Sequence, residues 1–315
     1  MIVVAGEALI DVIISPDGTI RAVPGGGPYN AARTLGRLGA DCTFLGVLAD
    51  DRFGQLLRHE LAAAGVELGC QRPTHAPSTL AVAQLSEGGT AEYRFYIEGT
   101  SLPMLSAREA WSGLPASFDA LHVGTLGILV EPTASVLEAL VDEYSNRTLI
   151  MLDPNCRPAV VTNYEPFRDR ALRLIAKADL IKVSDDDVAF LFPEGGFEQV
   201  RDGVVARGGV ILHSAGPGPI DVFTRDGNGQ VTPPTGDIVD TVGAGDIFGA
   251  TVLWSLMESG WRKGDQLGLE DVMPAVRVGA VAAHLACQRA GAEPPTRAEL
   301  GESAAATPRA AAPTR

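Results

Sequence analysis

Runs rich in valine and isoleucine alternate with helical patterns along most of this 315-residue chain. Strand-like runs occur at residues 2–5, 42–47, 120–123, 149–152, 180–183, 210–213 and 221–224. Helical patterns lie near 28–38, 53–64, 131–145, 165–177, 185–192 and 197–207, and two long helices follow near 243–259 and 271–289. Such alternation is typical of a mostly parallel sheet covered by helices on both faces. The sequence therefore predicts a three-layer α/β fold.

Two segments depart from this alternation and have the pattern of hairpins. Residues 11–23 contain a Pro-Asp-Gly turn, and a Gly-Gly pair separates the strand-like halves 79–86 and 91–98. These residue types favour tight turns between antiparallel strands. We therefore expect a small antiparallel sheet that stands off the main sheet as a lid.

No internal repeat or linker divides the chain into independent parts. We expect one domain over residues 1–300, with the lid inserted into it. Residues 301–315 are rich in alanine and proline, a composition that predicts a mobile C-terminal tail.

The net charge of −14, from 25 Lys and Arg against 39 Asp and Glu, restricts the partners. Nucleic acids and anionic membranes bind cationic surfaces, so neither is expected here. A small anionic substrate stays open, because backbone amides or a metal can hold it locally. The apolar N-terminus lacks the basic n-region of a signal peptide and carries Glu7 and Asp11, so it is expected to form a buried strand. With four scattered cysteines and no CxxC pair, a reduced cytoplasmic protein is expected.

The segment DTVGAGD, residues 240–246, leads from a loop directly into an apolar helix. Gly243, Ala244 and Gly245 leave backbone N–H groups uncovered at the helix N-terminus, where unpaired donors and the helix dipole attract phosphate. Asp246 follows in the first turn and is placed to accept a proton from an attacking nucleophile. The two common phosphate-binding loops, GxxxxGK[ST] and GxGxxG after a strand, are absent. Taken alone, the segment also fits a glycine-rich turn with an ordinary helix-start carboxylate.

The whole string DTVGAGD resembles the DTxGAGD signature of the PfkB, or ribokinase-like, family of sugar kinases. Further blocks resemble family motifs in the same order: GEALIDV, PGGGPYNAARTLGRLGA, LADDRFG, LDPNCRP, KVSDDDVAFL and RAGAEPP, all within residues 3–295. The resemblance implies a ribokinase-like α/β/α sandwich with a small β lid. It also implies transfer of the γ-phosphoryl group of ATP, with Mg²⁺, to a hydroxyl of a small sugar.

Matching positions carry the family's roles to individual residues. The resemblance implies that Asp246 is the catalytic base and that Gly243, Ala244 and Gly245 form the anion hole. It implies a substrate-binding set that consists of Asp11, Gly26, Gly27, Asn30, Arg94 and Arg157. Without the resemblance, Asp11 also fits a strand-end turn residue, and Arg157 fits a partner in a structural ion pair.

The nucleotide and metal positions depart further from the family pattern. Around Ser214 the chain resembles the TxGxxG adenine-nucleotide loop, with proline in place of the second glycine. The implied nucleotide-binding residues are Ser184, Ser214, Gly216, Gly218, Pro219, Ala280 and Ala283. The metal-linked NxxE pattern reads SDDD here, so Asp187 is the candidate to order the waters of Mg²⁺. Asp185 and Asp186 also fit a solvated acidic helix start. Asp240 and the carbonyl of Val242 match the family's K⁺ positions.

Two motifs bear on the identity of the sugar. The block GGGPYN has a proline, Pro28, at the position where fructokinases and 2-keto-3-deoxygluconate kinases also carry a proline. Ribokinases tend to have the sequence GGKGAN in this block. Ketodeoxygluconate kinases have a lid motif YYR, and this chain has Ile97 and Glu98 there, which disfavours an acid sugar by charge. A neutral ketohexose such as fructose is therefore expected. Ketodeoxygluconate kinase and ribokinase activities stay open, as does a catalytically inactive sugar-binding protein, whereas a dinucleotide oxidoreductase lacks its glycine fingerprint.

The lid also predicts an oligomeric state. An isolated two-stranded hairpin is marginal in water, and relatives often pair such lids between two subunits, so we expect a homodimer. Alternation along a strand places Tyr93 and Phe95 on one face and Arg94 and Tyr96 on the other. One of these faces is expected to cover the sugar.

Overall fold

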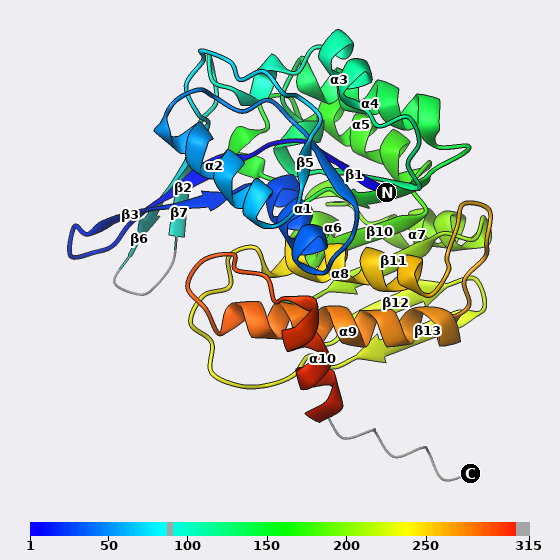
Figure 1. Cartoon of the computed structure of the whole chain (residues 1–315). Coiled ribbons are helices and arrows are strands. Elements are labelled where there is room, and N and C mark those ends of the chain that lie inside the picture. Colours follow the sequence, from blue (N-terminus) through cyan, green and yellow to red (C-terminus); the bar gives the residue numbers. More distant parts are fainter. Residues whose placement is uncertain (87–90, 307–315) are drawn as a thin grey trace.

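Two sheets organise the computed structural model, which describes residues 1–86 and 91–306 (Figure 1). The large sheet has the strand order β13-β12-β11-β10-β9-β8-β1-β4-β5. Its strands are β1 (Ile2–Ala5), β4 (Cys42–Leu45), β5 (Glu67–Leu68), β8 (Ala120–Gly124), β9 (Leu149–Asp153), β10 (Leu180–Ser184), β11 (Val210–Ser214), β12 (Ile220–Thr224) and β13 (Gly227–Val231). Among the described strands of this sheet, antiparallel pairs form only between β11 and β12 and between β12 and β13, so the predicted mostly parallel sheet is confirmed.

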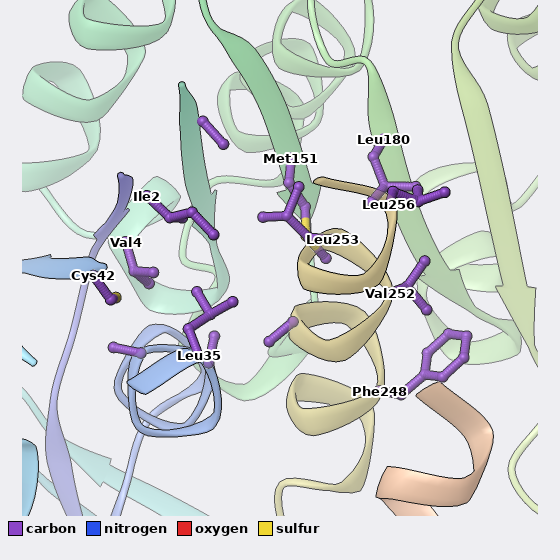
Figure 2. Close-up of a cluster of buried hydrophobic side chains, with 14 of the residues drawn as sticks. Ile2, Val4, Leu35, Cys42, Met151, Leu180, Phe248, Val252, Leu253 and Leu256 are labelled. Carbon is purple, nitrogen blue, oxygen red and sulfur yellow. The ribbon is translucent and has the colours of Figure 1, made fainter. Parts of the chain in front are cut away.

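Helices cover both faces of this sheet, as the alternating pattern predicted. One face packs against α1 (Gly27–Arg37), α2 (Arg52–Ala63), α8 (Ala244–Glu258) and α9 (Leu269–Cys287). The other packs against α3 (Ala107–Gly113), α4 (Thr133–Tyr144), α5 (Tyr164–Ile175), α6 (Asp185–Leu191) and α7 (Phe197–Ala206). Because successive strand residues point to opposite faces, Ile2 and Val4 enter the first core and Val3 enters the second. Figure 2 shows the first of these cores.

The lid is a four-stranded sheet in the order β3-β2-β6-β7 that projects from one side of the molecule (Figure 1). Its strands are β2 (Leu9–Ile14), β3 (Ile20–Gly25), β6 (Leu80–Leu85) and β7 (Ala91–Tyr96). Both hairpins are antiparallel, but β2 and β6 pair in parallel. The expectation of an antiparallel lid was therefore wrong at this junction, because turn residues determine pairing within a hairpin and not between hairpins. The Gly88–Gly89 turn lies outside the described residues.

The described residues end with helix α10 (Arg297–Ala306), which contacts α9. This helix includes the first residues of the expected tail, and residues 307–315 lie outside the description. Of the helices in residues 1–86 and 91–306, none is long and apolar enough to cross a membrane.

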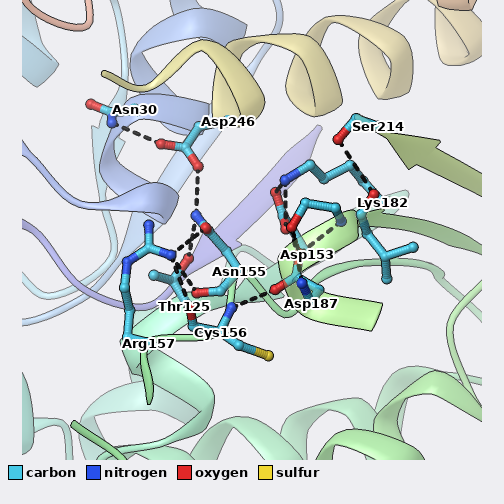
Figure 3. A network of polar contacts seen from close by, with 12 residues as sticks. Asn30, Thr125, Asp153, Asn155, Cys156, Arg157, Lys182, Asp187, Ser214 and Asp246 are labelled. Carbon is cyan, nitrogen blue, oxygen red and sulfur yellow. Dashed lines mark hydrogen bonds and ion pairs between the residues drawn. The ribbon is translucent and has the colours of Figure 1, made fainter. Parts of the chain in front are cut away.

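The carboxyl ends of the parallel strands bring distant segments to one edge of the large sheet. Glu7 follows β1, and the 3₁₀ turn η2 (Thr125–Ile128) follows β8. Asn155 follows β9, and the N-terminus of α8 lies at the same edge (Figure 3). Ligands of open α/β sheets bind outside the carboxyl ends of the strands, so a ligand-binding site is expected at this edge.

Candidate active site

A cavity of about 440 Å³ lies between the lid and the carboxyl edge of the large sheet. It collects polar side chains from segments that are far apart in the sequence. Its lining includes Glu7, Leu9, Asp11, Gly26, Gly27, Asn30, Ala81, Tyr93, Phe95, Thr125, Leu126, Asn155, Arg157, Lys182, Thr241, Val242, Gly243, Gly245 and Asp246. A cavity with convergent polar groups of both charges is suited to a small polar ligand.

Asp246 is held in place by two amide groups from other parts of the fold (Figure 3). Asn30 Nδ2 donates to Oδ2 of Asp246 at 2.9 Å, and Asn155 Nδ2 donates to Oδ1 at 3.1 Å. Each carboxylate oxygen has a further lone pair for another donor. The carboxylate is thus oriented in the cavity while it keeps the capacity to accept a proton.

The N-terminus of α8 begins at Gly243, which has φ 74° and is the N-cap residue. This left-handed conformation favours glycine, and a Cβ at this position would lie 2.4 Å from the Cβ of Ala292. No side chain caps the helix. The positive end of the α8 dipole therefore faces the cavity beside Asp246, which is the geometry of an anion site.

Asp11 and Asn30 supply the groups suited to hydroxyl binding. Burial, followed by the charge of Asp246, raises the pKa of Asp11 to about 7. Within the described part of the chain, Asn30 Oδ1 is buried and accepts no hydrogen bond. A buried acceptor without a donor is costly, and a sugar hydroxyl would supply the donor. The backbones of Gly26 and Gly27 complete this side of the cavity.

Glu7 is a site residue that the sequence motifs did not assign. Its Oε1 accepts from the N–H of Gly27 at 3.2 Å, and its Oε2 accepts from the N–H of Gly127 at 2.9 Å. Burial raises the pKa of Glu7 to about 8, although these backbone hydrogen bonds oppose the shift. The available signal was a carboxylate directly after a buried strand. Glu7 joins the start of α1 to η2 and thereby shapes the cavity.

Thr125 and Lys182 were also not assigned from the sequence, and both line the cavity together with Asn155. Thr125 and Asn155 have positive φ values of 52° and 39°, a backbone strain that often marks functional sites. Arg157 Nη1 donates to Oδ1 of Asn155 at 2.6 Å and to its carbonyl at 3.0 Å. Arg157 therefore stabilises the loop whose Asn155 orients Asp246. Among the described residues, no carboxylate forms an ion pair with Arg157.

The residues implied for the nucleotide lie outside this cavity. Ser184 caps α6, and Ser214 Oγ donates to the Val183 carbonyl at 3.4 Å. Ala280 is buried in the core and Ala283 packs against it. Gly216, Gly218 and Pro219 belong to the loop that joins β11 to β12.

Asp187, the residue predicted to order the waters of Mg²⁺, accepts hydrogen bonds from three protein donors. Its Oδ1 accepts from the Cys156 N–H at 2.6 Å, and its Oδ2 accepts from the N–H and hydroxyl of Ser184 at 2.9 and 2.7 Å. Its side chain is buried and closes the capping box of α6. Across residues 1–86 and 91–306, no group of three or more His, Cys, Asp or Glu side chains is arranged to hold a metal ion. Asp187 therefore works as a helix cap.

Asp240, the residue matched to the family's K⁺ position, joins separate segments through its carboxylate. Its Oδ1 accepts from the Val242 N–H at 3.0 Å, its Oδ2 accepts from the Gly291 N–H at 2.9 Å, and Arg21 of the lid lies 3.8 Å away. Both oxygens are engaged by donors of the protein. The K⁺ site stays a prediction from the resemblance.

The lid presents Tyr93 and Phe95 to the cavity, with their rings stacked at 6.0 Å. Arg94 points to the opposite face and is exposed, so the structure does not bring it to the site as the substrate-binding assignment expected. Ile97 and Glu98 line a separate cavity of about 620 Å³ at the base of the lid. The charge of Glu98 consequently does not act inside the active-site cavity.

This arrangement predicts opposite results for two neighbouring lid variants. Phe95→Ala removes an apolar wall of the cavity and should raise the KM for the sugar about tenfold, as the loss of roughly 50 Å² of apolar contact implies. Arg94→Ala is the matched control and should leave the KM unchanged. Steady-state kinetics of both variants check this prediction. A raised KM in Arg94→Ala with a normal KM in Phe95→Ala would show that the Arg94 face of β7, and not the Phe95 face, lines the cavity.

The fold and the cavity together define an enzyme class. A carboxylate base beside the uncapped N-terminus of a helix, with hydroxyl-binding groups opposite, is the arrangement of a phosphotransferase that acts on an alcohol. The chain belongs to the pfkB family of carbohydrate kinases, whose model matches residues 1–299. It is therefore a carbohydrate kinase with the ribokinase-like fold.

Fructokinases are prominent among its relatives. The fructokinase of Rhizobium leguminosarum bv. trifolii is 34% identical over 263 residues, which cover 81% of this chain and 79% of the relative. A crystal structure of fructokinase with bound ATP from Xylella fastidiosa matches with a TM-score of 0.81 at 22% identity, covering 96% of this chain and 97% of that one. Fructokinase from Vibrio cholerae O395, in its fructose-, ADP- and calcium-bound form, matches with a TM-score of 0.77 at 23% identity and covers 95% of both chains.

Proposed function

We propose that this protein transfers the γ-phosphoryl group of MgATP to a primary hydroxyl of fructose. The observation that carries the proposal is the hydrogen bond of 2.9 Å between Asn30 and Asp246. It joins a hydroxyl-binding amide to the base at the N-terminus of α8. The fructokinase relatives support the choice of sugar.

The geometry supports direct transfer within the cavity. Asp11 and Asn30 hold sugar hydroxyls, and the reacting hydroxyl donates to Asp246. As its oxygen attacks phosphorus, the proton passes to the Asp246 carboxylate and the bond from phosphorus to the ADP oxygen breaks. The amides at the start of α8 stabilise the charge on the transferring group. Closure of Tyr93 and Phe95 over the sugar excludes water, which would otherwise hydrolyse ATP.

The charge of the cavity favours a neutral sugar on its hydroxyl-binding side. Asp11 and Asp246 line that side, and an additional sugar carboxylate beside their carboxylates would meet like charge. The second candidate is 2-keto-3-deoxygluconate kinase, because the cations Arg157 and Lys182 also line the cavity and would suit an acid sugar.

A screen of ADP release over several sugars tests the proposal. Fructose, ribose and 2-keto-3-deoxygluconate are compared with a reaction that lacks sugar, with wild-type enzyme and MgATP throughout. We expect the highest kcat/KM with fructose. A preference for 2-keto-3-deoxygluconate or ribose would move the assignment within the family, and sugar binding without ADP release would indicate an inactive sugar-binding protein.

We also propose that the lid pairs two subunits into a homodimer. Ile20 is 66% exposed and Tyr96 is 52% exposed, and both belong to the lid. Exposed apolar side chains on a small sheet are typical of an interaction surface. Sedimentation velocity at micromolar concentration should give the mass of a dimer. A fully active monomer would contradict this proposal.

A further inference from the structure

Lys182 is a buried cation that the catalytic scheme above does not use. It lies in β10, on the sheet face that packs against α8, and its side chain is 5% exposed. Its charged partner is Asp153 at the end of β9, whose side chain is 3% exposed. Lys182 Nζ lies 3.3 Å from each Asp153 oxygen, whereas charge-assisted hydrogen bonds are about 2.7–2.9 Å long. The ion pair is therefore loose for a buried one.

The position of the ammonium relates it to the anion site. Lys182 lines the active-site cavity together with Gly245 and Asp246. A Cβ built on Gly245 would lie 3.1 Å from Lys182 Nζ. The absence of a side chain at Gly245 thus allows the ammonium to lie against the first turn of α8, whose amides face the same cavity.

The remaining hydrogen-bonding capacity of Lys182 points into this cavity. An ammonium has three donors, and among the described residues Asp153 is the one partner assigned to it. Burial lowers the pKa of Lys182, but the charges of Asp153, Asp187 and Asp246 outweigh this and raise it above the usual value. The group is therefore cationic at neutral pH. A buried charge with spare donors is costly unless a ligand uses them.

We propose that Lys182 is a further catalytic residue whose ammonium donates to a non-bridging oxygen of the transferring phosphoryl group. It binds this group from the sheet side, while the amides of α8 bind it from the helix side. Asp153 is the positioning residue that holds the ammonium. Lys182 keeps its three protons throughout, since the proton of the sugar hydroxyl passes to Asp246. The proposal rests on the kinase activity and is independent of which sugar is phosphorylated.

A purely structural role is the alternative, in which Lys182 only neutralises Asp153. The variant Lys182→Met and the double variant Lys182→Met/Asp153→Asn separate the two roles. Methionine has similar length without charge, and the double variant leaves no unpaired buried carboxylate. If Lys182 contacts the phosphoryl group, both variants should lose kcat by about 10²- to 10³-fold, the usual effect of removing one such donor. If its role is structural, neutralising Asp153 should restore kcat to within about threefold of wild type, which would overturn the proposal.

Lys263→Met is the matched control, because Lys263 also pairs with a partly buried aspartate, Asp179, at 2.7 Å. Lys263 does not line the active-site cavity, so its kcat should stay at the wild-type value. Melting temperatures of all variants report folding. Should Lys182→Met fail to fold, the charge-balanced double variant provides the kinetic answer.

Binding of a phosphoryl-transfer mimic gives a second readout. The affinities of ADP alone and of ADP with aluminium fluoride are measured in the presence of Mg²⁺ and sugar. In the double variant, the affinity gained on adding aluminium fluoride should fall by about 10²-fold, with ADP affinity nearly unchanged. An unchanged gain would overturn the role of Lys182. Failure of the kinase assignment itself would appear separately, as wild-type enzyme that releases no ADP with any sugar.

Discussion

Asp246→Asn is expected to lower kcat by about 10²- to 10⁴-fold while changing the sugar KM much less. The amide has nearly the size of the carboxylate but cannot accept the proton of the attacking hydroxyl. Asn30 and Asn155 both donate to Asp246 in the native protein. Because an amide has a single oxygen, one of these two donors must face an NH₂ group in the variant, so a small increase in KM is also expected.

Asp271→Asn is a close control for this variant. Asp271 is the third residue of α9, as Asp246 is of α8, and both helices have a glycine at the N-cap. Asp271 does not line the cavity, so its variant should keep normal turnover. Steady-state kinetics with coupled ADP detection compares the two variants. If the kcat of Asp246→Asn stayed within about tenfold of the wild-type value, Asp246 would not be the catalytic base.

Asp11→Asn is expected to weaken sugar binding and to stabilise the fold above neutral pH. A hydroxyl hydrogen bond to a charged acceptor contributes about 1.5–3 kcal/mol, so the sugar KM should rise about 10- to 100-fold. The stability effect has the opposite sign. Burial and the charge of Asp246 raise the pKa of Asp11 from 3.8 to about 7, so the ionised carboxylate is tolerated better in the unfolded chain than in the folded one.

The pH dependence of this effect follows from proton linkage. Between the unfolded pKa and the folded value near 7, the native state holds the Asp11 proton more tightly, so the free energy of unfolding falls as pH rises and then stays low. Asparagine does not titrate. The variant should therefore exceed wild type in stability by up to about 4 kcal/mol at pH 8, with the difference vanishing toward pH 4.

Urea unfolding at pH 5 and pH 8 checks the prediction for Asp11→Asn. Asp17→Asn is the control within the same hairpin, because Asp17 is exposed and hydrogen-bonds Thr19 in the turn. It should leave the sugar KM unchanged and should not gain stability at pH 8. If Asp11→Asn is less stable than wild type at pH 8, the electrostatic account of Asp11 is wrong.

Local patterns in the sequence determined the layers of this fold and the helix start that we propose as the anion site. The continuous apolar run of residues 2–5 required a buried surface on both faces of the strand, and helices on each side supply it. The DTVGAGD segment places an uncapped helix start and a carboxylate within a few residues of one another. Both features depend on neighbours in the chain, and for that reason they can be predicted without tertiary contacts.

Contacts between distant segments were decided by the tertiary structure. Asn30 and Asp246 are 216 residues apart, and strand order and helix crossovers bring them together. The parallel pairing of β2 with β6 and the inward face of β7 depend on how the hairpins dock, which no turn residue encodes. The ion pair of Lys182 with Asp153 exists because β9 and β10 are neighbours in the sheet. No sequence periodicity predicts a buried charge on a strand. The role of such a charge depends on the partner residue that the neighbouring strand places beside it.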